Sequence, residues 1–298
     1  MKKFILLLFA LLLLPEFITP AQGAMELSGT FDWKSPAVQK LRSGVDYVTM
    51  ELKAPRLMKL AAVRVDLTAP GLRFKMTPRA EKWGEPMTDV PKYTIRTRRI
   101  TCRKFMEQSV AKGENMCVVI NGSPWGPWQS PWNHPYADRQ GLIVADGVLV
   151  SPPMEKRPTF ALYKDGSCGF FQWKEGDDIS KIRHAISGFS FVLDKGKSVG
   201  KDNPKSLAPR TGYGLCPRKR YLYLLVVDGR QEQYSLGCSV YEVGELLKFF
   251  GAADGLNMDG GGSTTLFVRK DNKMIKLNHY IQDRERTVGG AMGIIFEK

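Results

Sequence analysis

Short apolar segments joined by tight turns recur through most of this chain, and they restrict the folds open to it. Residues 141–144 and 148–150 flank Asp146-Gly147, a pair typical of the type I′ turn that closes a β-hairpin. A second hairpin is predicted for residues 189–193 and 197–199. Strands that pair through such short turns indicate a large amount of antiparallel sheet.

Other segments read as strands of differing burial. Residues 62–67 alternate between apolar and polar side chains, which is typical of a half-buried strand. Residues 116–120 are continuously apolar and lead into Asn121-Gly122, which predicts a central strand. Residues 221–227 are all apolar or aromatic and predict a strongly buried strand.

Two helices are predicted between these strands. Ser239 and Glu242 form a capping box, after which Val243, Leu246, Leu247 and Phe250 build one apolar face and Gly251 ends the helix. A second helix is expected at residues 101–111. No linker or internal repeat stands out. We therefore predict a single α+β domain over residues 24–298, with mixed, largely antiparallel β-sheets and a few packed helices.

The N-terminus has the layout of a secretory signal peptide, which we assign to residues 1–23. Two lysines precede an apolar run at residues 4–14, and small residues follow at 21, 23 and 24. The run is shorter than the roughly 20 residues that a spanning helix needs. A retained N-terminal anchor is the alternative. We expect a secreted or periplasmic protein of the cell envelope, with no stable membrane span after signal removal.

The chain is strongly basic, which favours anionic partners. Its formal net charge is +14, and +13 without residues 1–23, which hold two lysines and one glutamate. Nucleic acid is not expected as a partner, because export is predicted and no zinc-finger, RRM or helix-turn-helix signature is present. An anionic or phosphorylated glycan fits better. The densest basic run, residues 96–99, is interpreted as a solvated face.

The cysteines and histidines show no metal-binding spacing. No CxxC or CxxH pair exists among the five cysteines, and His134, His184 and His279 lack HxxxH or HExxH spacing. The odd number of cysteines leaves at least one thiol unpaired, and Cys117 is predicted to be a buried small hydrophobe. No cofactor is expected, although a divalent metal is not excluded.

The stretch at residues 257–266 contains the best candidate for chemistry. An apolar segment leads to Asp259, and Gly260, Gly261, Gly262 and Ser263 follow. Three glycines exceed what an ordinary turn needs, and they can expose backbone N–H groups to a ligand. The stretch is not a P-loop, because Ser263 stands where the lysine is required. Nor is it a GxSxG nucleophile elbow, because no glycine follows Ser263 at the right offset.

Other polar and aromatic residues are weaker candidates. Asn121 and Asp228 each follow an apolar strand and precede a glycine, so each is either an ordinary turn former or a binding group. An arginine can bind phosphate through two parallel hydrogen bonds, or it can be a simple surface charge. The candidates are Arg210, Arg230, Arg284 and Arg286. A loop rich in proline and glycine carries three tryptophans, which either stack on sugar rings or pack the loop onto the body; these are Trp125, Trp128 and Trp132.

Together these motifs resemble the phosphodiester glycosidase family over about residues 43–296. The matching segments are residues 44–47, 63–67, 119–122, 141–144 with 146–147, 186–188, 208–211, 227–231, the capped helix, 257–264 and Arg286. The block at 257–263 is the specific one. The chain departs from the family pattern after Asn121-Gly122, where Ser123-Pro124-Trp125 and the tryptophan-rich segment stand. It matches more loosely after Arg286.

The resemblance implies an exported glycosidase that hydrolyses the C1–O bond of a sugar-1-phosphodiester, for example an N-acetylglucosamine phosphodiester. A departing phosphate monoester has a second pKa of about 6 and leaves without a strong acid, so one carboxylate with arginines suffices. We assign Asp259 as base or nucleophile, and Arg210 and Arg286 as phosphate ligands. The expected substrate-binding residues are Asn121, Gly122, Trp125, Trp128, Thr211, Asp228, Gly260, Gly261, Gly262 and Ser263.

Two other functions fit the sequence. A non-catalytic envelope glycan-binding module would use the tryptophan loop and turn nothing over. A phosphodiesterase would cut the P–O bond in place of the C1–O bond.

Overall fold

The computed structural model describes residues 27, 29–129, 133–138, 140–201, 203, 205–282 and 284–297. The predicted signal peptide and Trp132 lie outside the described residues. No helix in the described part of the chain is long and apolar enough to cross a membrane.

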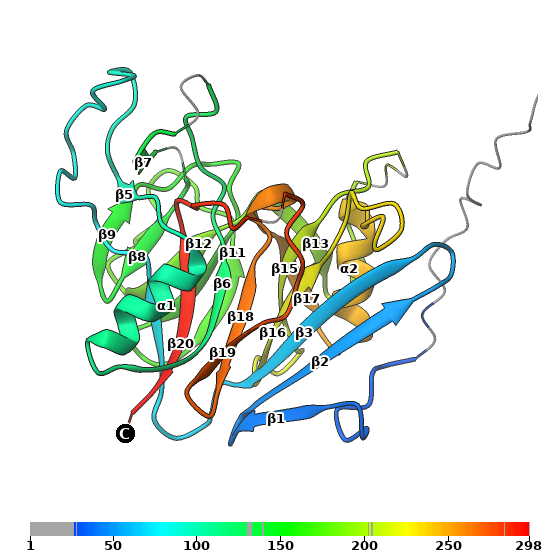
Figure 1. Cartoon of the computed structure of the whole chain (residues 1–298). Helices are drawn as coiled ribbons and strands as arrows, with labels where there is room; N and C mark the ends of the chain where they lie inside the picture. The colour runs from blue at the N-terminus through cyan, green and yellow to red at the C-terminus, as the bar shows by residue number, and fades with distance from the viewer. Residues whose placement is uncertain are drawn as a thin grey trace, which may run out of the picture.

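The largest sheet has eight strands, and it runs diagonally across Figure 1. Their order in the sheet is β1 (Gln39–Arg42), β2 (Val45–Leu52), β3 (Met58–Asp66), β16 (Tyr221–Val227), β15 (Arg210–Leu215), β17 (Asp254–Asn257), β13 (Ser190–Asp194) and β14 (Lys197–Ser198). The predicted strand at residues 221–227 is therefore confirmed, and it lies near the middle of this sheet, where both of its faces are covered.

Two five-stranded sheets and a short ribbon complete the β-structure. One sheet has the order β19 (Lys273–Lys276), β18 (Leu266–Lys270), β6 (Asn115–Asn121), β20 (Ala291–Phe296) and β4 (Leu72–Met76). The other has the order β11 (Cys168–Phe171), β10 (Thr159–Tyr163), β12 (Ile182–Ser187), β8 (Ile143–Ala145) and β9 (Val148–Ser151). The ribbon pairs β5 (Thr97–Arg98) with β7 (Tyr136–Ala137). Among the described strands, every pairing between neighbours is antiparallel.

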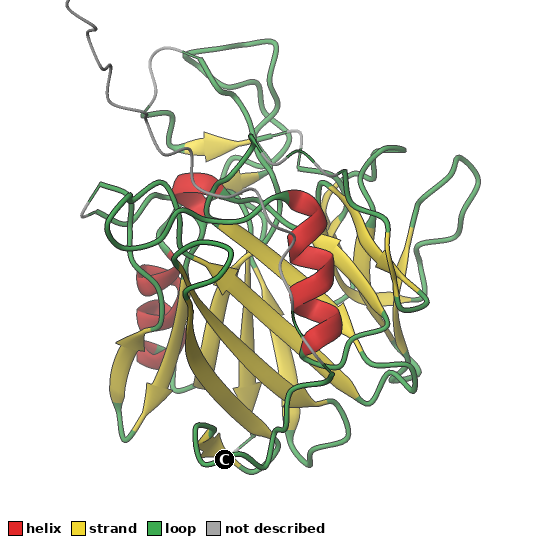
Figure 2. Ribbon diagram, turned by 90° about the vertical axis from the view of Figure 1, so that its right-hand side faces the viewer, coloured by secondary structure: helices red, strands yellow, loops and turns green. Residues whose placement is uncertain are grey.

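The main core lies between the large sheet and the two smaller ones. Tyr213 of the large sheet and Phe160 of β10 are its bulkiest fully buried side chains, and their rings meet edge to face. Helix α1 (Cys102–Ala111) covers the outer face of β6, β18 and β20, and α2 (Val240–Phe249) covers the outer face of β13, β15 and β17. Figure 2 shows the two helices on opposite sides of the sheets.

Both predicted helices are confirmed, as is the capping box predicted for the second. The Thr101 hydroxyl accepts a hydrogen bond from the Lys104 amide at the start of α1. At α2 the capping box is complete, because Ser239 accepts from the Glu242 amide and the Glu242 carboxylate accepts from the Ser239 amide. The same carboxylate pairs with Arg56, which ties the helix start to the loop between β2 and β3.

The predicted hairpins are also confirmed. Asp146 and Gly147 have φ values of 51° and 79°, the positive pair that a type I′ turn requires. Lys195 and Gly196 repeat this geometry between β13 and β14, with φ values of 47° and 79°. The largely antiparallel prediction therefore holds, but the described chain is richer in strand than an α+β fold with a few packed helices implies. It has two α-helices and the short 3₁₀ turn η1 (Gly261–Ser263).

All five cysteines are buried and unpaired. Cys117 lies in the main core on β6, as predicted for a small hydrophobe. Burial raises the pKa of its thiol to about 12, so the residue contributes to packing and stays protonated.

Candidate functional site

The ends of β6 and β17 meet at the upper side of the molecule in Figure 1. The Asp259 amide, two residues beyond β17, donates to the Gly122 carbonyl at 2.8 Å, one residue beyond β6. The Asn121 side-chain amide donates to the Asp259 carbonyl at 2.7 Å. These two bonds fix the backbone at Asp259 from both sides.

Asn121 holds this junction together through every polar atom of its side chain. Its Oδ1 accepts from the Thr211 hydroxyl of β15 at 2.9 Å and from the Thr265 amide at 3.0 Å. Asn121 and Thr211 are both fully buried. The structure therefore brings both predicted residues next to Asp259, but their side chains bond inside the protein and position the turn.

The three glycines that follow Asp259 are needed for three different reasons. A Cβ at Gly260 would stand 2.8 Å from the Pro209 carbonyl oxygen. Gly261 has φ +61°, a left-handed conformation that other residues rarely adopt. A Cβ at Gly262 would overlap the guanidinium of Arg286, 2.5 Å from its Cζ. The run thus lets the chain turn sharply while an arginine lies directly on its backbone.

Backbone N–H groups of this turn are partly used within the protein. The Gly261 amide donates to the Pro209 carbonyl at 2.8 Å, and the Ser263 amide donates to the Gly260 carbonyl at 3.2 Å. These two amides therefore hold the turn closed and do not face a ligand. The Ser263 hydroxyl differs, because it is buried beside the Asp259 carboxyl and makes no hydrogen bond of normal geometry to a described residue.

The Asp259 carboxylate is buried but incompletely bonded. The residue is 7% exposed, and its Oδ2 has no hydrogen-bond partner in the described chain. Burial raises the pKa of this carboxyl to about 6, while the nearby Ser263 hydroxyl, the Arg286 guanidinium, the Gly260 amide and Arg157 act in the opposite direction. At neutral pH the group is mostly ionised and is basic enough to take a proton or attack an electrophile.

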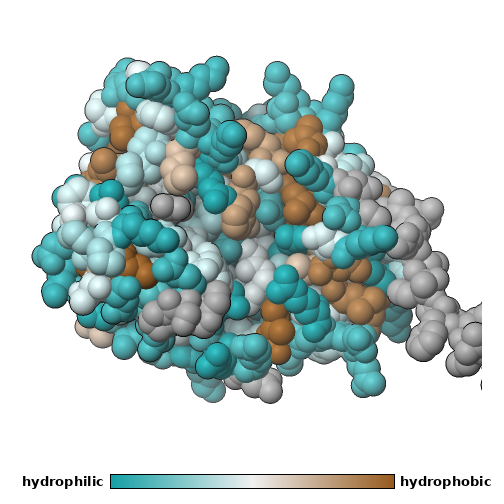
Figure 3. Space-filling view, turned by 90° about the horizontal axis from the view of Figure 1, so that it is seen from above, coloured by the Kyte–Doolittle hydropathy of each residue, from teal (hydrophilic) through white to brown (hydrophobic). Residues whose placement is uncertain are grey.

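A cleft of about 600 Å³ opens beside this turn. It is lined by Arg99, Trp125, Pro127, Trp128, Asn133, Arg230, Gly262, Ile281, Gln282, Arg284, Glu285, Arg286 and Thr287. Four of these residues are arginines and one is a carboxylic acid. The face seen from above is mostly hydrophilic, with small separate hydrophobic patches (Figure 3). The cleft therefore suits an anionic ligand.

Two of the predicted tryptophans form one wall of the cleft. Trp125 and Trp128 stack with their ring centroids 4.3 Å apart and an interplanar angle of 28°. The guanidinium of Arg99 lies 4.0 Å from the Trp125 ring, and that of Arg286 lies 5.1 Å from the Trp128 ring. Trp125 is buried, whereas Trp128 is 49% exposed. The inner ring therefore packs the loop onto the body, as one prediction had it, while the outer ring faces the cleft and stacking on a sugar stays a prediction.

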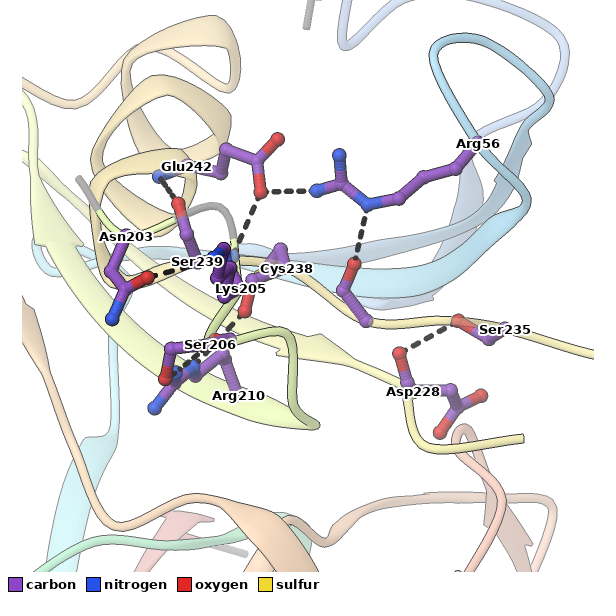
Figure 4. A network of polar contacts seen from close by, with 11 residues as sticks. Arg56, Asn203, Lys205, Ser206, Arg210, Asp228, Ser235, Cys238, Ser239 and Glu242 are labelled. Carbon is purple, nitrogen blue, oxygen red and sulfur yellow. Dashed lines mark hydrogen bonds and ion pairs between the residues drawn. The ribbon is translucent and has the colours of Figure 1, made fainter. Parts of the chain in front are cut away.

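Arg210 lies near the turn, but its guanidinium points elsewhere. It donates from Nε to the Cys238 carbonyl at 3.2 Å and from Nη2 to the Ser206 carbonyl at 2.8 Å. Figure 4 shows these contacts in a network with the capped start of α2. The arginine expected to hold phosphate is thus bonded to two backbone carbonyls of the protein.

Asp228 opens onto a different cleft, of about 640 Å³, which Tyr234, His279, Lys59 and other residues line. Its Oδ1 accepts from the His279 amide at 2.8 Å. Burial raises the pKa of its carboxyl to about 6. The structure therefore separates Asp228 from the arginine-lined cleft.

Two arginines near the site were not among the predicted ones. The residue run 96–99 was interpreted as a solvated face, and this is wrong for Arg99, whose Nη2 donates to the Thr287 hydroxyl at 3.0 Å inside the cleft. Burial, with help from Arg286, lowers the pKa of Arg99 to about 10. Arg157 precedes β10 and lies close enough for the Asp259 charge to act on it. Its only sequence signal is an Arg-Pro pair before a strand.

The fold and this junction define a β-rich protein with a buried carboxylate on a glycine turn beside a cationic cleft. Residues 115–295, more than half of the chain, match the family model described as phosphodiester glycosidase. The chain therefore belongs to the phosphodiester glycosidase family, as its motifs predicted.

Several solved structures share the fold. A hypothetical protein from Synechocystis has a TM-score of 0.63 at 12% identity; the alignment covers 88% of this chain and 64% of that one, so this chain spans less than two thirds of that relative. A second similar structure is the catalytic domain of zebrafish N-acetylglucosamine-1-phosphodiester alpha-N-acetylglucosaminidase, auto-inhibited by its pro-peptide. Its TM-score is 0.58 at 18% identity, and the alignment covers 90% of this chain and 86% of that one. A third is a protein of Burkholderia pseudomallei described as a putative exported protein. Its TM-score is 0.52 at 12% identity, and the alignment covers 80% of this chain and 74% of that one. No curated protein sequence matches this chain significantly.

Proposed function

We propose that this protein is an exported hydrolase that cleaves the C1–O bond of a sugar-1-phosphodiester, such as an N-acetylglucosamine phosphodiester. The observation that carries the proposal is the pairing of Asp259 with Arg286. A buried carboxylate with an unpartnered Oδ2 adjoins a guanidinium that rests on Gly262 and lines the cleft. Membership of the phosphodiester glycosidase family supports the reaction class.

The chemistry needs one carboxylate and positive charge. When the C1–O bond breaks, its electron pair leaves with the phosphate oxygen, which Arg286 stabilises as negative charge grows. Asp259 either attacks C1 directly, before water hydrolyses the intermediate, or takes a proton from the water that attacks C1. Because the departing phosphate monoester is a good leaving group, a second carboxylic acid is not required.

Arg157 replaces Arg210 in this proposal as the second cation near Asp259. Both Arg157 and Arg286 favour the charged form of the Asp259 carboxyl. Asn121 and Thr211 act as positioning residues, since their bonds hold the turn. Trp128 offers an exposed ring on which a sugar or leaving group can stack.

The direct experiment compares the purified protein with Asp259→Asn on methyl N-acetylglucosamine-1-phosphodiester. We expect kcat/KM to fall by at least about 10³-fold, as for loss of a catalytic carboxylate. Asp194→Asn, an exposed aspartate at the end of β13, is the matched control and should retain wild-type activity. A folded Asp259→Asn variant with wild-type kcat/KM would overturn the catalytic assignment.

Two measurements separate the proposal from its alternatives. Hydrolysis in ¹⁸O-labelled water places the label in the sugar if C1–O breaks, and in the phosphate if P–O breaks. The stacked tryptophans also suit a glycan-binding module without activity, which predicts glycan binding that Trp128→Ala abolishes and no turnover by the wild-type protein.

Export and the absence of a cofactor are parts of the same proposal. The signal-peptide layout of residues 1–23 predicts that the protein is found in the envelope or medium fraction after cell fractionation. Because arginines supply the positive charge, EDTA should leave turnover unchanged. Loss of activity with EDTA and recovery with a divalent metal would contradict this part.

A further inference from the structure

Two guanidinium groups lie over consecutive glycines of the turn. A Cβ on Gly261 would stand 3.3 Å from Arg230 Nη1, and a Cβ on Gly262 would overlap the Arg286 guanidinium. Consecutive Cα atoms are only about 3.8 Å apart, so the two cations approach the same short piece of backbone. Arg284 lines the same cleft, which places three arginines around its mouth in addition to Arg99.

The described acidic groups do not neutralise this cluster. Among the described residues, Glu285 is the one acid that lines the cleft, and its Oε1 accepts from the Arg103 amide at the start of α1, at 2.9 Å. The guanidiniums of Arg230 and Arg284 have neither an ion-pair nor a hydrogen-bond partner among the residues that the structure describes. Burial lowers the pKa of Arg286, and the repulsion from Arg230 and Arg284 acts in the same direction, while Asp259 opposes it.

Binding of one phosphodiester does not require this many positively charged side chains. A phosphodiester carries a single negative charge, which Arg286 beside Asp259 can meet with a two-pronged contact. Arg230 and Arg284 are exposed and line the cleft, whereas Asp259 is buried, so the two arginines form the part of the site that is nearer to solvent. That outer part receives the second ester group of the phosphate, which departs together with the phosphate when C1–O breaks.

We propose that Arg230 and Arg284 form a second anion subsite, which binds a negatively charged group on the leaving-group side of the substrate. The favoured substrate is therefore a sugar phosphodiester whose second ester group, which departs with the phosphate, carries a further phosphate or carboxylate. This inference rests on the proposed function for the identity of the first anion. The subsite itself is defined by Arg230, Arg284 and the cleft that they line.

The kinetic test uses two synthetic substrates that differ in one anionic group. Both are N-acetylglucosamine-1-phosphodiesters; the second ester group is propyl in one and 3-phosphopropyl in the other. We expect kcat/KM for the charged substrate to exceed that for the neutral one by about tenfold, as for one charge-assisted contact. A third substrate with a 2-carboxyethyl group distinguishes phosphate from carboxylate as the preferred second anion. Equal kcat/KM values for all three substrates would overturn the subsite.

Variants assign the preference to particular residues. In Arg230→Gln and in Arg284→Gln the ratio of the two kcat/KM values should fall toward one. Arg218→Gln, an exposed arginine in the turn at the far end of β15 and β16, is the matched control and should keep the wild-type ratio. A ratio that stays at the wild-type value in both cleft variants would contradict the assignment.

A binding measurement keeps this inference separate from the proposed reaction. The non-hydrolysable phosphonate analogues of the propyl and 3-phosphopropyl substrates are titrated against the full-length mature protein, with tryptophan fluorescence as the signal. Tighter binding of the charged analogue, weakened in Arg230→Gln and by salt, supports the subsite even if no substrate is turned over. Turnover of both substrates with equal analogue affinities would leave the reaction standing and exclude the subsite.

Discussion

Asp259 and Asp228 are built from the same local pattern but have different surroundings. Each follows a strand of the large sheet and precedes a glycine, and burial raises the pKa of each carboxyl to about 6. Asp228 accepts from the His279 amide, and Tyr234 and Asn278 also favour its charged form. Asp259 keeps an unpartnered oxygen and has arginines nearby. An unusual pKa therefore does not identify a reactive group; its neighbours do.

The largest expected difference between the two aspartates is in activity. Asp259→Asn should lower kcat/KM by about 10³-fold, whereas Asp228→Asn should change it by less than about tenfold, because only the first removes a group that touches substrate. Steady-state kinetics on the phosphodiester substrate, with circular dichroism as the control for folding, gives both values. A comparable loss in Asp228→Asn would remove the contrast between the two sites.

Alanine substitutions at the glycines that follow the two aspartates should have different effects, one on activity and one on stability. Gly262→Ala displaces Arg286, and a misplacement of about 1 Å can cost about 10²-fold in kcat/KM. Gly229→Ala instead meets backbone, with Pro209 N at 2.6 Å and the Gly237 Cα at 2.8 Å, and should destabilise the fold by about 1–3 kcal/mol. Denaturant unfolding and kinetics on both variants separate these outcomes. A stable, active Gly262→Ala protein would contradict the close packing of Arg286.

The pH dependence of the free energy of unfolding should be similar for substitutions of the two aspartates. A carboxyl whose folded pKa lies above its value of 3.8 binds its proton more tightly when folded, so its contribution to stability falls as pH rises from about 4 to about 6 and is constant above. Relative to that of the wild type, the free energy of unfolding of each Asn variant should therefore rise by about 2–3 kcal/mol between pH 4 and pH 7.

The measurement is the free energy of unfolding of wild type and variants at both pH values. Asp194→Asn, at an exposed position, controls for the effect of the substitution itself. If neither buried aspartate changes the pH dependence, the raised pKa values are wrong. The rate of hydrolysis should also fall below about pH 6, when Asp259 becomes protonated.

The smallest expected effect concerns the exposed apolar residue of each cleft. Trp128→Ala removes a half-exposed ring that faces the arginine-lined cleft, so KM should rise by about fivefold, as for the loss of one ring-stacking contact. Ile275→Ala makes a similar change in the Asp228 cleft and should leave KM unchanged. Equal KM values for the two variants would show that the tryptophan wall does not contact substrate.

Local patterns predicted most of the fold, because its turns and caps are decided by neighbours in the sequence. The Asp146-Gly147 hairpin and the capping box at Ser239 depend on residues within four positions of one another. Asn121 and Asp259 could be chosen from their strand-end positions, and the structure brings them into contact.

The arginines could not be sorted in the same way. Arg210 and Arg286 look alike in sequence, but the first has backbone carbonyls of Cys238 and Ser206 within reach and the second has a glycine and a ring. Arg99 and Arg157 come from segments more than 100 residues before Asp259, so only the tertiary packing reveals them. Which guanidinium faces a ligand is decided by long-range contacts that no periodicity records.

Arg286 is held in place by contact with Gly262 and by the face of Trp128, and no described residue accepts a hydrogen bond from its guanidinium. Its orientation thus depends on shape, while all five of its N–H donors stay available. A ligand that takes these donors displaces water alone and breaks no bond within the protein. Association at this cleft should therefore be fast and limited by diffusion, with a rate that depends on ionic strength more than on any rearrangement of the chain.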